Sequence, residues 1–156
     1  MKPSYWIIAL TVLILDQATK YWAAATLIKG SIPIAPVLKF TLVHNTGAAF
    51  GFMSSAGGWQ NIFFMVVAAL ASVLIAVMLW RLQDRWVGSG LALILGGALG
   101  NLVDRALHGY VIDFIDVYYG TWHWPAFNIA DSAITVGAVV LIIDALKPKT
   151  GRRHAG

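Results

Sequence analysis

The sequence contains no cysteine and no glutamate, and charged residues make up only 12% of its 156 positions. The absence of cysteine excludes disulfides, thiolate metal ligands and a cysteine nucleophile. Soluble domains carry about 25% charged residues, so this chain has too few charges to cover a surface that faces water. Its hydrophobic content of 59% instead indicates an integral membrane protein, and its length suits a single domain.

Four apolar segments are long enough to cross a bilayer as helices, which takes about 20 residues each. They cover residues 5–25, 61–80, 91–108 and 129–146. The first resembles a cleaved signal peptide, but Asp16 and Lys20 interrupt its apolar run and three more spans follow it. We therefore interpret it as a retained anchor. The predicted fold class is an all-α membrane protein, a four-helix transmembrane bundle.

Two longer loops, residues 26–60 and 109–128, join the spans on one side of the membrane. Residues 32–43 are rich in β-branched side chains and contain two prolines, which limits them to short or edge strands. We expect a small β-element here, followed by a loop over residues 45–60 that moves over a site. An ordinary connecting loop fits the composition equally well. The aromatic residues of the second loop predict a position at the membrane interface.

The distribution of basic residues predicts the orientation. Seven of the eleven lysines and arginines fall on the side of the termini, namely Lys2, Arg81, Arg85, Lys147, Lys149, Arg152 and Arg153. The positive-inside rule then places both termini in the cytoplasm and the two longer loops outside. The same distribution explains the net charge of +4 through membrane lipid and topology, without a nucleic acid partner.

Polar side chains converge at one depth, near the outer ends of the spans. Lys20 lies about 7–8 Å below the outer end of the first span at 1.5 Å per residue. Ionisable side chains within a membrane are expensive, so each is a functional-site hypothesis until it has a partner. The set comprises Asp16 and Lys20 in the first span, Asn101, Asp104 and Arg105 in the third, and Asn128 and Asp131 in the fourth.

Charge pairing separates these aspartates from one another. Asp16 has Lys20 one helical turn away on its own face. Asp104 is adjacent to Arg105, and we expect the two to form a structural network with Asn101. Asp16 and Asp104 are therefore interpreted as structural.

Asp113 and Asp131 are left without an obvious cation. Two carboxyl groups brought together in a poorly hydrated site tend to share one proton, so that one acts as a base and the other as an acid. This is the chemistry of aspartic proteases. Asp116 competes for the role because it lies only three residues after Asp113, but we expect it to be exposed and wetted.

Other classes of function fit less well. The histidines His44, His108 and His123 lack a metal-ligand spacing, so we predict interface histidines and no metal cofactor. A small proton-coupled transporter is the main alternative, although a transporter places its ionisable groups near the bilayer midplane. A purely structural four-helix subunit leaves the uncompensated Asp113 and Asp131 unexplained.

Five short motifs follow one another along the chain. They are DQATK at 16–20, NTGAAF at 45–50, GNLVDR at 100–105, VIDF at 111–114 and FNIAD at 127–131. Each is weak alone, but in this order on four predicted spans they resemble the lipoprotein signal peptidases (signal peptidase II). These are membrane aspartyl endopeptidases of bacteria, and the resemblance covers nearly the whole chain.

The resemblance implies a catalytic dyad of Asp113 and Asp131 in the outer leaflet of the bacterial inner membrane. It also implies an outward β-element and a mobile outer loop. The implied substrate is a prolipoprotein whose cysteine already carries diacylglycerol, cleaved just before that cysteine, and the implied inhibitor is the cyclic peptide globomycin. The residues implied to bind substrate or support the site are Asp16, Lys20, Asn45, Gly47, Asn101, Asp104, Arg105 and Asn128.

Overall fold

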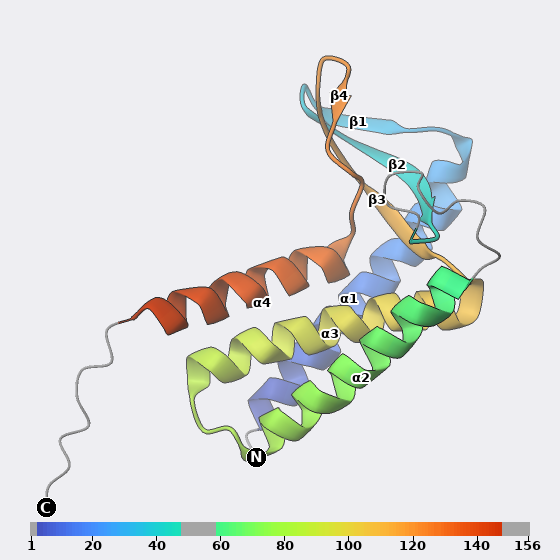
Figure 1. Ribbon diagram of the computed structural model, residues 1–156. Coiled ribbons are helices and arrows are strands. Elements are labelled where there is room, and N and C mark those ends of the chain that lie inside the picture. The colour runs from blue at the N-terminus through green and yellow to red at the C-terminus, as the bar shows by residue number, and fades with distance from the viewer. Residues whose placement is uncertain (1–2, 48–58, 148–156) are drawn as a thin grey trace, which may run out of the picture.

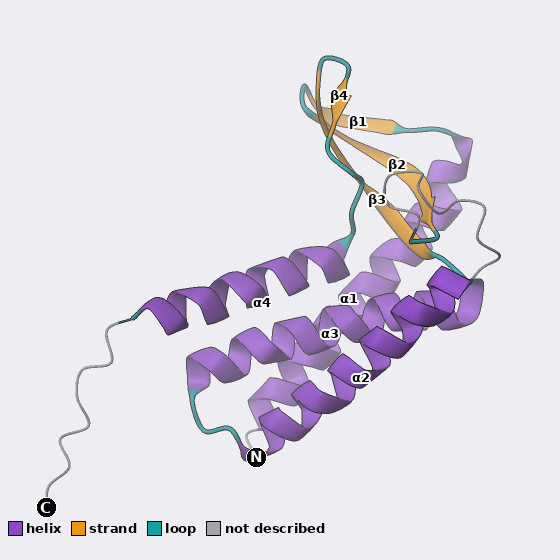
Figure 2. Cartoon of the chain, in the orientation of Figure 1, coloured by secondary structure: helices purple, strands orange, loops and turns teal. Residues whose placement is uncertain are grey.

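The computed structural model describes residues 3–47 and 59–147, which form four long helices and a small sheet (Figures 1 and 2). The helices are α1 (Pro3–Thr26), α2 (Trp59–Arg81), α3 (Arg85–His108) and α4 (Ile129–Leu146), with a short 3-10 helix, η1 (Leu27–Lys29), after α1. All four are long and apolar enough to cross a membrane. The predicted fold class is therefore confirmed. The predicted tail and most of the predicted mobile loop lie outside the described residues.

Helix α3 is the centre of the bundle, since α1, α2 and α4 all pack against it. Glycines make these contacts close. A Cβ added to Gly96 would lie 2.6 Å from the Ala9 carbonyl oxygen of α1, and one added to Gly137 of α4 would lie 2.5 Å from the Gly90 carbonyl oxygen. Small residues at such positions allow helix backbones to approach each other within a membrane.

Helix α3 begins at Arg85, earlier than the predicted start at residue 91, because Asp84 caps it. The Asp84 carboxylate accepts hydrogen bonds from the backbone N–H groups of Trp86 (2.8 Å) and Val87 (3.1 Å). Such a cap satisfies donors that the first helical turn leaves free. At the other end, Gly109 adopts the left-handed conformation (φ 82°) and ends the helix.

The sheet has four antiparallel strands in the order β1 (Ile32–Ala35), β2 (Leu38–Asn45), β3 (Val111–Tyr119) and β4 (Trp122–His123). The expected β-element in the first loop is present, but half of the sheet comes from the second loop, for which the sequence predicts an interface segment. The first four residues of β3 are buried on both faces, so the strand lacks the polar–apolar alternation that identifies a half-buried strand.

The sheet lies at the end of the bundle where α1 ends and α4 begins (Figure 1). It is fixed there by a small core of Ala23, Leu27 and Phe114. The Phe114 ring of β3 makes edge-to-face contact with Trp22 of α1 at 6.3 Å and with Phe40 of β2 at 5.8 Å. This contact sets β3, and with it Asp113, directly against the helix ends.

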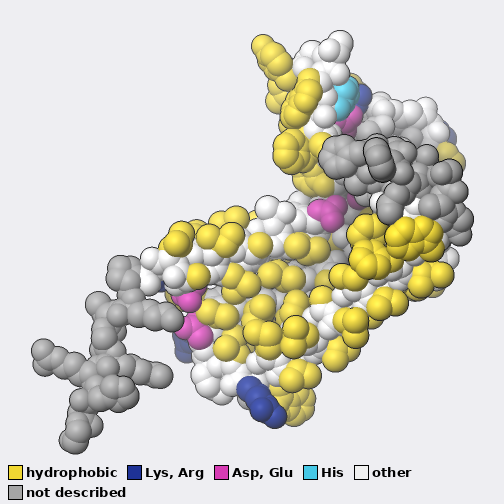
Figure 3. All heavy atoms as spheres, in the orientation of Figure 1, with side chains coloured by type: hydrophobic (Ala, Val, Ile, Leu, Met, Phe, Trp, Pro, Cys, Tyr) yellow, Lys and Arg dark blue, Asp and Glu magenta, His cyan; other side chains and the backbone are white. Residues whose placement is uncertain are grey.

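The surface of the helices is strongly apolar, as expected for contact with lipid. Hydrophobic side chains cover most of the helical face in Figure 3, and acidic side chains appear at the junction between the helices and the sheet. Exposed apolar side chains occur on α1, α2 and α4, among them Ile7, Leu70 and Ile142. At this junction, acidic side chains therefore border the apolar surface of the helices.

Candidate active site

A buried cluster of charges joins α1 to α3 below the sheet. Lys20 Nζ lies 2.8 Å from Asp16 Oδ2 and 3.0 Å from Asp104 Oδ2, and the three side chains are at most 2% exposed. The expected pairing of Asp16 with Lys20 is confirmed. The expected pairing of Asp104 with Arg105 is wrong: Asp104 faces Lys20 across the close contact of α1 and α3. Two carboxylates around one ammonium keep the cluster paired in a region that excludes water.

The same cluster anchors the elements that carry the candidate dyad. Asp16 Oδ1 accepts a hydrogen bond from the backbone N–H of Ala130 (2.9 Å) at the start of α4. Asp104 Oδ2 accepts one from the backbone N–H of Ile112 (2.9 Å) in β3. Lys20 thus supports, through its two partners, the residues that directly precede Asp113 and Asp131. This is a supporting role, and it matches the interpretation of these residues as structural.

Gln17 belongs to this cluster and was missed by the sequence analysis. Its Nε2 donates to Asp104 Oδ1 (2.9 Å) and to the Gly100 carbonyl oxygen (3.2 Å). Gln17 is uncharged, so charge pairing did not select it, although it lies within the DQATK motif. Gly100 itself leaves room for Asp16, because an added Cβ would collide with Asp16 Oδ2.

Two asparagines connect the charge cluster to the candidate dyad. Asn101 Oδ1 accepts from Lys20 Nζ (2.9 Å), and Asn101 Nδ2 donates to Asp131 Oδ1 (2.8 Å). Asn128 Nδ2 donates to Asp113 Oδ1 (2.7 Å) and approaches Asn101 Oδ1 at 3.2 Å. The amides therefore orient both carboxyl groups from the protein interior.

Asp113 occupies the third position of β3 and is 1% exposed. Its Oδ2 accepts a hydrogen bond from Asn45 Nδ2 (2.8 Å) at the end of β2. Burial raises the pKa of Asp113 from 3.8 to about 6, with the hydrogen bond from Asn45 opposing the rise and the nearby charge of Asp131 adding to it. This carboxyl group therefore exchanges its proton close to neutral pH, as a general acid or base requires.

Asp131 lies in the first turn of α4, where it forms a capping box with Asn128. Asn128 Oδ1 accepts from the Asp131 backbone N–H (2.9 Å), and Asp131 Oδ2 accepts from the Asn128 backbone N–H (3.2 Å). In the described ranges, no lysine or arginine lies within ion-pair distance of Asp113 or Asp131. Asn128 is the direct hydrogen-bonded link between them.

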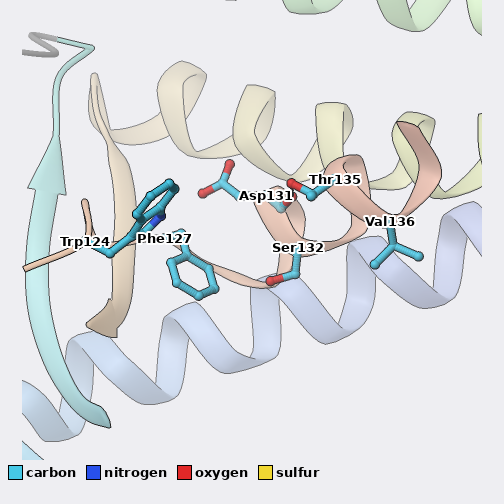
Figure 4. A pocket seen from close by; sticks show the side chains of 6 residues that line it. All are labelled: Trp124, Phe127, Asp131, Ser132, Thr135 and Val136. Atoms are coloured by element: carbon cyan, nitrogen blue, oxygen red, sulfur yellow. Dashed lines mark hydrogen bonds between the residues drawn. The ribbon is translucent and has the colours of Figure 1, made fainter. Parts of the chain in front are cut away.

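A groove of about 450 Å³ opens beside Asp131 (Figure 4). Its lining comprises Trp124, Phe127, Asp131, Ser132, Thr135 and Val136. The two hydroxyl groups are already used within the chain, since Ser132 donates to the Asn128 carbonyl (2.9 Å) and Thr135 to the Asp131 carbonyl (2.8 Å). The Asp131 carboxylate, which points toward Trp124 and Phe127 in Figure 4, is the acidic group in the lining of this apolar groove.

Gly47 and Arg105 meet the same aromatic ring. The Arg105 guanidinium lies over Phe64 of α2, 5.3 Å from its centroid, and a Cβ added to Gly47 would lie 2.6 Å from that ring. Gly47 has φ 84°, and its N–H donates to Asn45 Oδ1 (2.9 Å), so the turn fixes the amide that holds Asp113. Phe64 was missed because one more aromatic residue in an apolar span carries no signal.

Asp116 does not match its expected exposure. It is only 6% exposed, and its carboxylate contacts His123 Nδ1 (2.8 Å) and Lys39 Nζ (3.4 Å). The strand register explains the burial, since Lys39 of β2 lies opposite Asp116 of β3. His123, expected as an interface histidine, is a partner of Asp116. Among the described residues, no group of three histidine, cysteine or acidic side chains is placed to hold a metal ion.

The comparisons with known proteins identify the family. Residues 8–147 match the family model for signal peptidase (SPase) II, Peptidase_A8. The chain belongs to the signal peptidase II family. The lipoprotein signal peptidase of Burkholderia mallei (strain SAVP1) is 49% identical over 148 residues, covering 94% of this chain and 89% of that protein. The lipoprotein signal peptidase of Alteromonas mediterranea (strain DSM 17117) is 52% identical over 148 residues, covering 91% and 79%.

Two solved structures of bacterial membrane enzymes share the fold. A bacterial membrane enzyme determined by the in meso method at 2.3 Å resolution has a TM-score of 0.82 and 33% identity, with 99% of this chain and 94% of that chain covered. A second, at 1.9 Å resolution, has a TM-score of 0.80 and 35% identity, with 94% of each covered. The chain is therefore a multi-pass bacterial membrane protease that removes signal peptides, and the transporter alternative is not supported.

Proposed function

We propose that this signal peptidase II family member is an aspartic endopeptidase in which Asp113 and Asp131 hydrolyse the peptide bond. The observation that carries the proposal is the pair of carboxyl groups linked through Asn128 with no cation within ion-pair distance in the described ranges. Buried carboxyl groups are normally paired with a cation. An unpaired dyad that opens on an apolar groove is the arrangement expected of an acid–base pair.

In the proposed reaction, one aspartate is ionised and the other carries a proton. The ionised carboxylate takes a proton from water while the water oxygen attacks the scissile carbonyl carbon. The protonated carboxyl donates a hydrogen bond to the carbonyl oxygen, which gains negative charge as the tetrahedral intermediate forms. The carbon–nitrogen bond then breaks as a proton passes to the leaving amine, and the two carboxyls return to their starting state once the protons redistribute.

The proposed substrate is a prolipoprotein with a diacylglyceryl-modified cysteine, cleaved just before that cysteine. The relatives are lipoprotein signal peptidases, which supports this substrate class. The groove beside Asp131 supports it physically, because apolar walls and satisfied hydroxyl groups favour a hydrophobic substrate that approaches from the lipid. We also propose that globomycin-type cyclic peptides inhibit by occupying the dyad.

The other predicted site residues fall into three groups in this proposal. Asp16, Lys20 and Asp104 hold α4 and β3 in place, as their buried bonds indicate. Asn101 and Asn128 orient the dyad from inside. Asn45, Gly47 and Arg105 lie on the substrate side, where β2 and α3 end beside Phe64.

We propose the orientation with both termini in the cytoplasm and the sheet outside. Among the described residues, Arg81, Arg85 and Lys147 lie at the ends of α2, α3 and α4 that are farthest from the sheet, which favours a cytoplasmic location for that end of the bundle. The dyad then lies in the outer leaflet, where a prolipoprotein presents its cleavage site after export.

The test is cleavage of a diacylglyceryl-modified prolipoprotein by the purified full chain in detergent micelles. Asp113→Asn and Asp131→Asn should each lower kcat by several orders of magnitude, about 10⁴-fold or more, because each removes an acid–base group. Asp116→Asn is the matched control, since this aspartate lies on the same strand as Asp113 but bonds Lys39 and His123. It should retain activity within about tenfold.

A parallel set with EDTA tests for a metal requirement, and wild-type activity should be unchanged. Activity in either dyad variant would contradict the proposal. An inactive Asp116→Asn variant with a native melting temperature would show that the wrong carboxyl was paired. Loss of wild-type activity in EDTA would assign the reaction to a metal-dependent mechanism.

A further inference from the structure

A second apolar groove lies at the opposite end of the bundle from the dyad. It has a volume of about 380 Å³ and is lined by Trp6 of α1 and by Ala76, Val77, Trp80 and Arg81 of α2. The first residues of α1 and the last residues of α2 meet at the end of the bundle that holds the N-terminus (Figure 1). Nothing in the proposed peptidase chemistry uses this groove.

The groove exists because α1 and α2 both pack on α3 and make little contact with each other. Two helices that flank a third leave a furrow between them on the lipid-facing side. Within a bilayer such a furrow does not fill with water, because its walls are hydrocarbon and indole. Lipid acyl chains therefore occupy the furrow between α1 and α2.

The cation at the mouth of the groove is Arg81, which has no ion pair among the described residues. Arg81 is the last residue of α2 and is exposed. The two acidic side chains at this end are already in use, since Asp84 caps α3 and Asp144 bonds Lys147 at 3.4 Å. The Arg81 guanidinium can therefore pair with an anion from outside the chain.

The polar groups on the groove walls are hydrogen-bond donors. Arg81 carries the five N–H groups of a guanidinium, which match the oxygens of a phosphate. Trp6 and Trp80 give the groove indole walls. A ligand that is apolar along its length and anionic at its head therefore complements both the apolar walls and the exposed Arg81. Basic pockets between transmembrane helices bind anionic lipid head groups for this reason.

We propose that this groove, formed by Trp6, Ala76, Val77, Trp80 and Arg81, binds an anionic phospholipid. One acyl chain lies between α1 and α2 against the two indole rings, and the phosphate lies on Arg81. The bound lipid closes the gap between α1 and α2 and thereby stabilises the bundle from the end opposite the dyad. The proposal does not depend on the aspartic mechanism, since it concerns neither Asp113 nor Asp131.

Native mass spectrometry of the full chain tests this proposal. The protein is delipidated in detergent and exposed to equal amounts of dioleoyl phosphatidylglycerol, which is anionic, and dioleoyl phosphatidylcholine, which is zwitterionic. Wild type should retain the anionic lipid about fivefold more than the zwitterionic one, the preference that one basic residue near a lipid head group supplies. Arg81→Gln should bind the two lipids equally, and Arg81→Lys should keep part of the preference.

Two further variants separate a site from a general effect of charge. Arg85→Gln removes a cation from the same end of the bundle but not from the groove, and it should keep the wild-type preference. Ala76→Trp fills the groove and should lower retention of both lipids. Prolipoprotein cleavage and far-UV circular dichroism show whether each variant is folded.

Equal retention of the two lipids by wild type, or an equal loss of preference in Arg81→Gln and Arg85→Gln, would overturn the proposal. So would undiminished retention by a folded Ala76→Trp.

Discussion

Asn128 donates a 2.7 Å hydrogen bond from its Nδ2 to Asp113 Oδ1, while its Oδ1 accepts the backbone N–H of Asp131 at 2.9 Å. One side chain therefore does two things: it caps α4 and it sets the position of one candidate catalytic carboxyl relative to the other. The cap needs only an acceptor, whereas the link to Asp113 needs a donor. The two functions can be separated by substitution.

Asn128→Ser should separate them. Serine is as good an N-cap as asparagine, so the hydroxyl of the substituted serine should still accept the backbone N–H of Asp131. The serine side chain is too short to donate a hydrogen bond to Asp113 at the same time. We expect kcat to fall about 100-fold with little change in KM. A misplacement of a reacting group by about 1 Å lowers the rate by about that factor. Asn128→Ala should lose the same activity and also about 1 kcal/mol more stability than Asn128→Ser.

The measurements are steady-state kinetics on a lipidated prolipoprotein and thermal unfolding in the same detergent. A fully active Asn128→Ser variant would mean that the dyad is aligned without the amide. An Asn128→Ser variant as unstable as Asn128→Ala would mean that the cap and the alignment are not separable.

The pKa of Asp113 gives a second prediction. Asn45 donates a hydrogen bond to its carboxylate at 2.8 Å, which stabilises the ionised form and lowers the pKa of Asp113 against the effect of burial. Asn45→Ala removes that donor, so the pKa of Asp113 must rise above its present value of about 6. One limb of the profile of kcat/KM against pH should therefore move to higher pH.

The limb that moves identifies the role of Asp113. If the acid limb moves, activity requires ionised Asp113 and this residue is the base; if the alkaline limb moves, activity requires the protonated form and it is the acid. Thr41→Ala on the same strand is the control and should move neither limb, because the Thr41 hydroxyl bonds only Ser31 in the described ranges. A shift to lower pH in Asn45→Ala would contradict the assignment of its hydrogen bond.

The buried charge cluster gives a third prediction. Lys20 holds Asp16 at 2.8 Å and Asp104 at 3.0 Å, so Lys20→Met leaves two buried carboxyl groups without a cation. Breaking a buried pair in this way costs about 3–5 kcal/mol. We expect a large fall in melting temperature and in the yield of folded protein. The triple variant Asp16→Asn, Lys20→Met, Asp104→Asn removes the charges as well and should recover part of the loss. A Lys20→Met variant with wild-type stability would mean that the cluster contributes little.

The sequence predicted the spans because a membrane demands long apolar runs, and it predicted the depth of the polar residues because helix rise converts sequence position into depth. The depth of a residue in the membrane does not show which side of the helix its side chain faces. For that reason Asp104 was paired with its neighbour Arg105, when the α1–α3 contact turns it toward Lys20. Only the packing of helices against one another decides such a choice.

The strand β3 was missed for a different reason. Asp113 and Asp116 interrupt its apolar residues, and its first half is buried on both faces between the helix ends and β2. A strand in that position carries no alternation of polar and apolar residues. The same burial explains the wrong expectation for Asp116, which pairs with Lys39 across the sheet. The motifs, in contrast, depend on residue identity alone, so they led to the family without the strand.

The groove beside Asp131 gives the last prediction, which concerns substrate access. Val136 lines it and is 53% exposed, and Ile143 lies on the same face of α4 two turns further along, 54% exposed and outside the groove. Val136→Trp should fill part of the groove and raise KM for a lipidated prolipoprotein about tenfold, because the hydrophobic substrate can no longer occupy that part. The substitution does not change Asp113 or Asp131, so kcat should stay close to that of wild type. Ile143→Trp adds the same bulk on the lipid side and should leave KM unchanged. Equal effects of the two tryptophans would point to a general disturbance of α4, and an unchanged KM in Val136→Trp would exclude this groove as the path of the substrate.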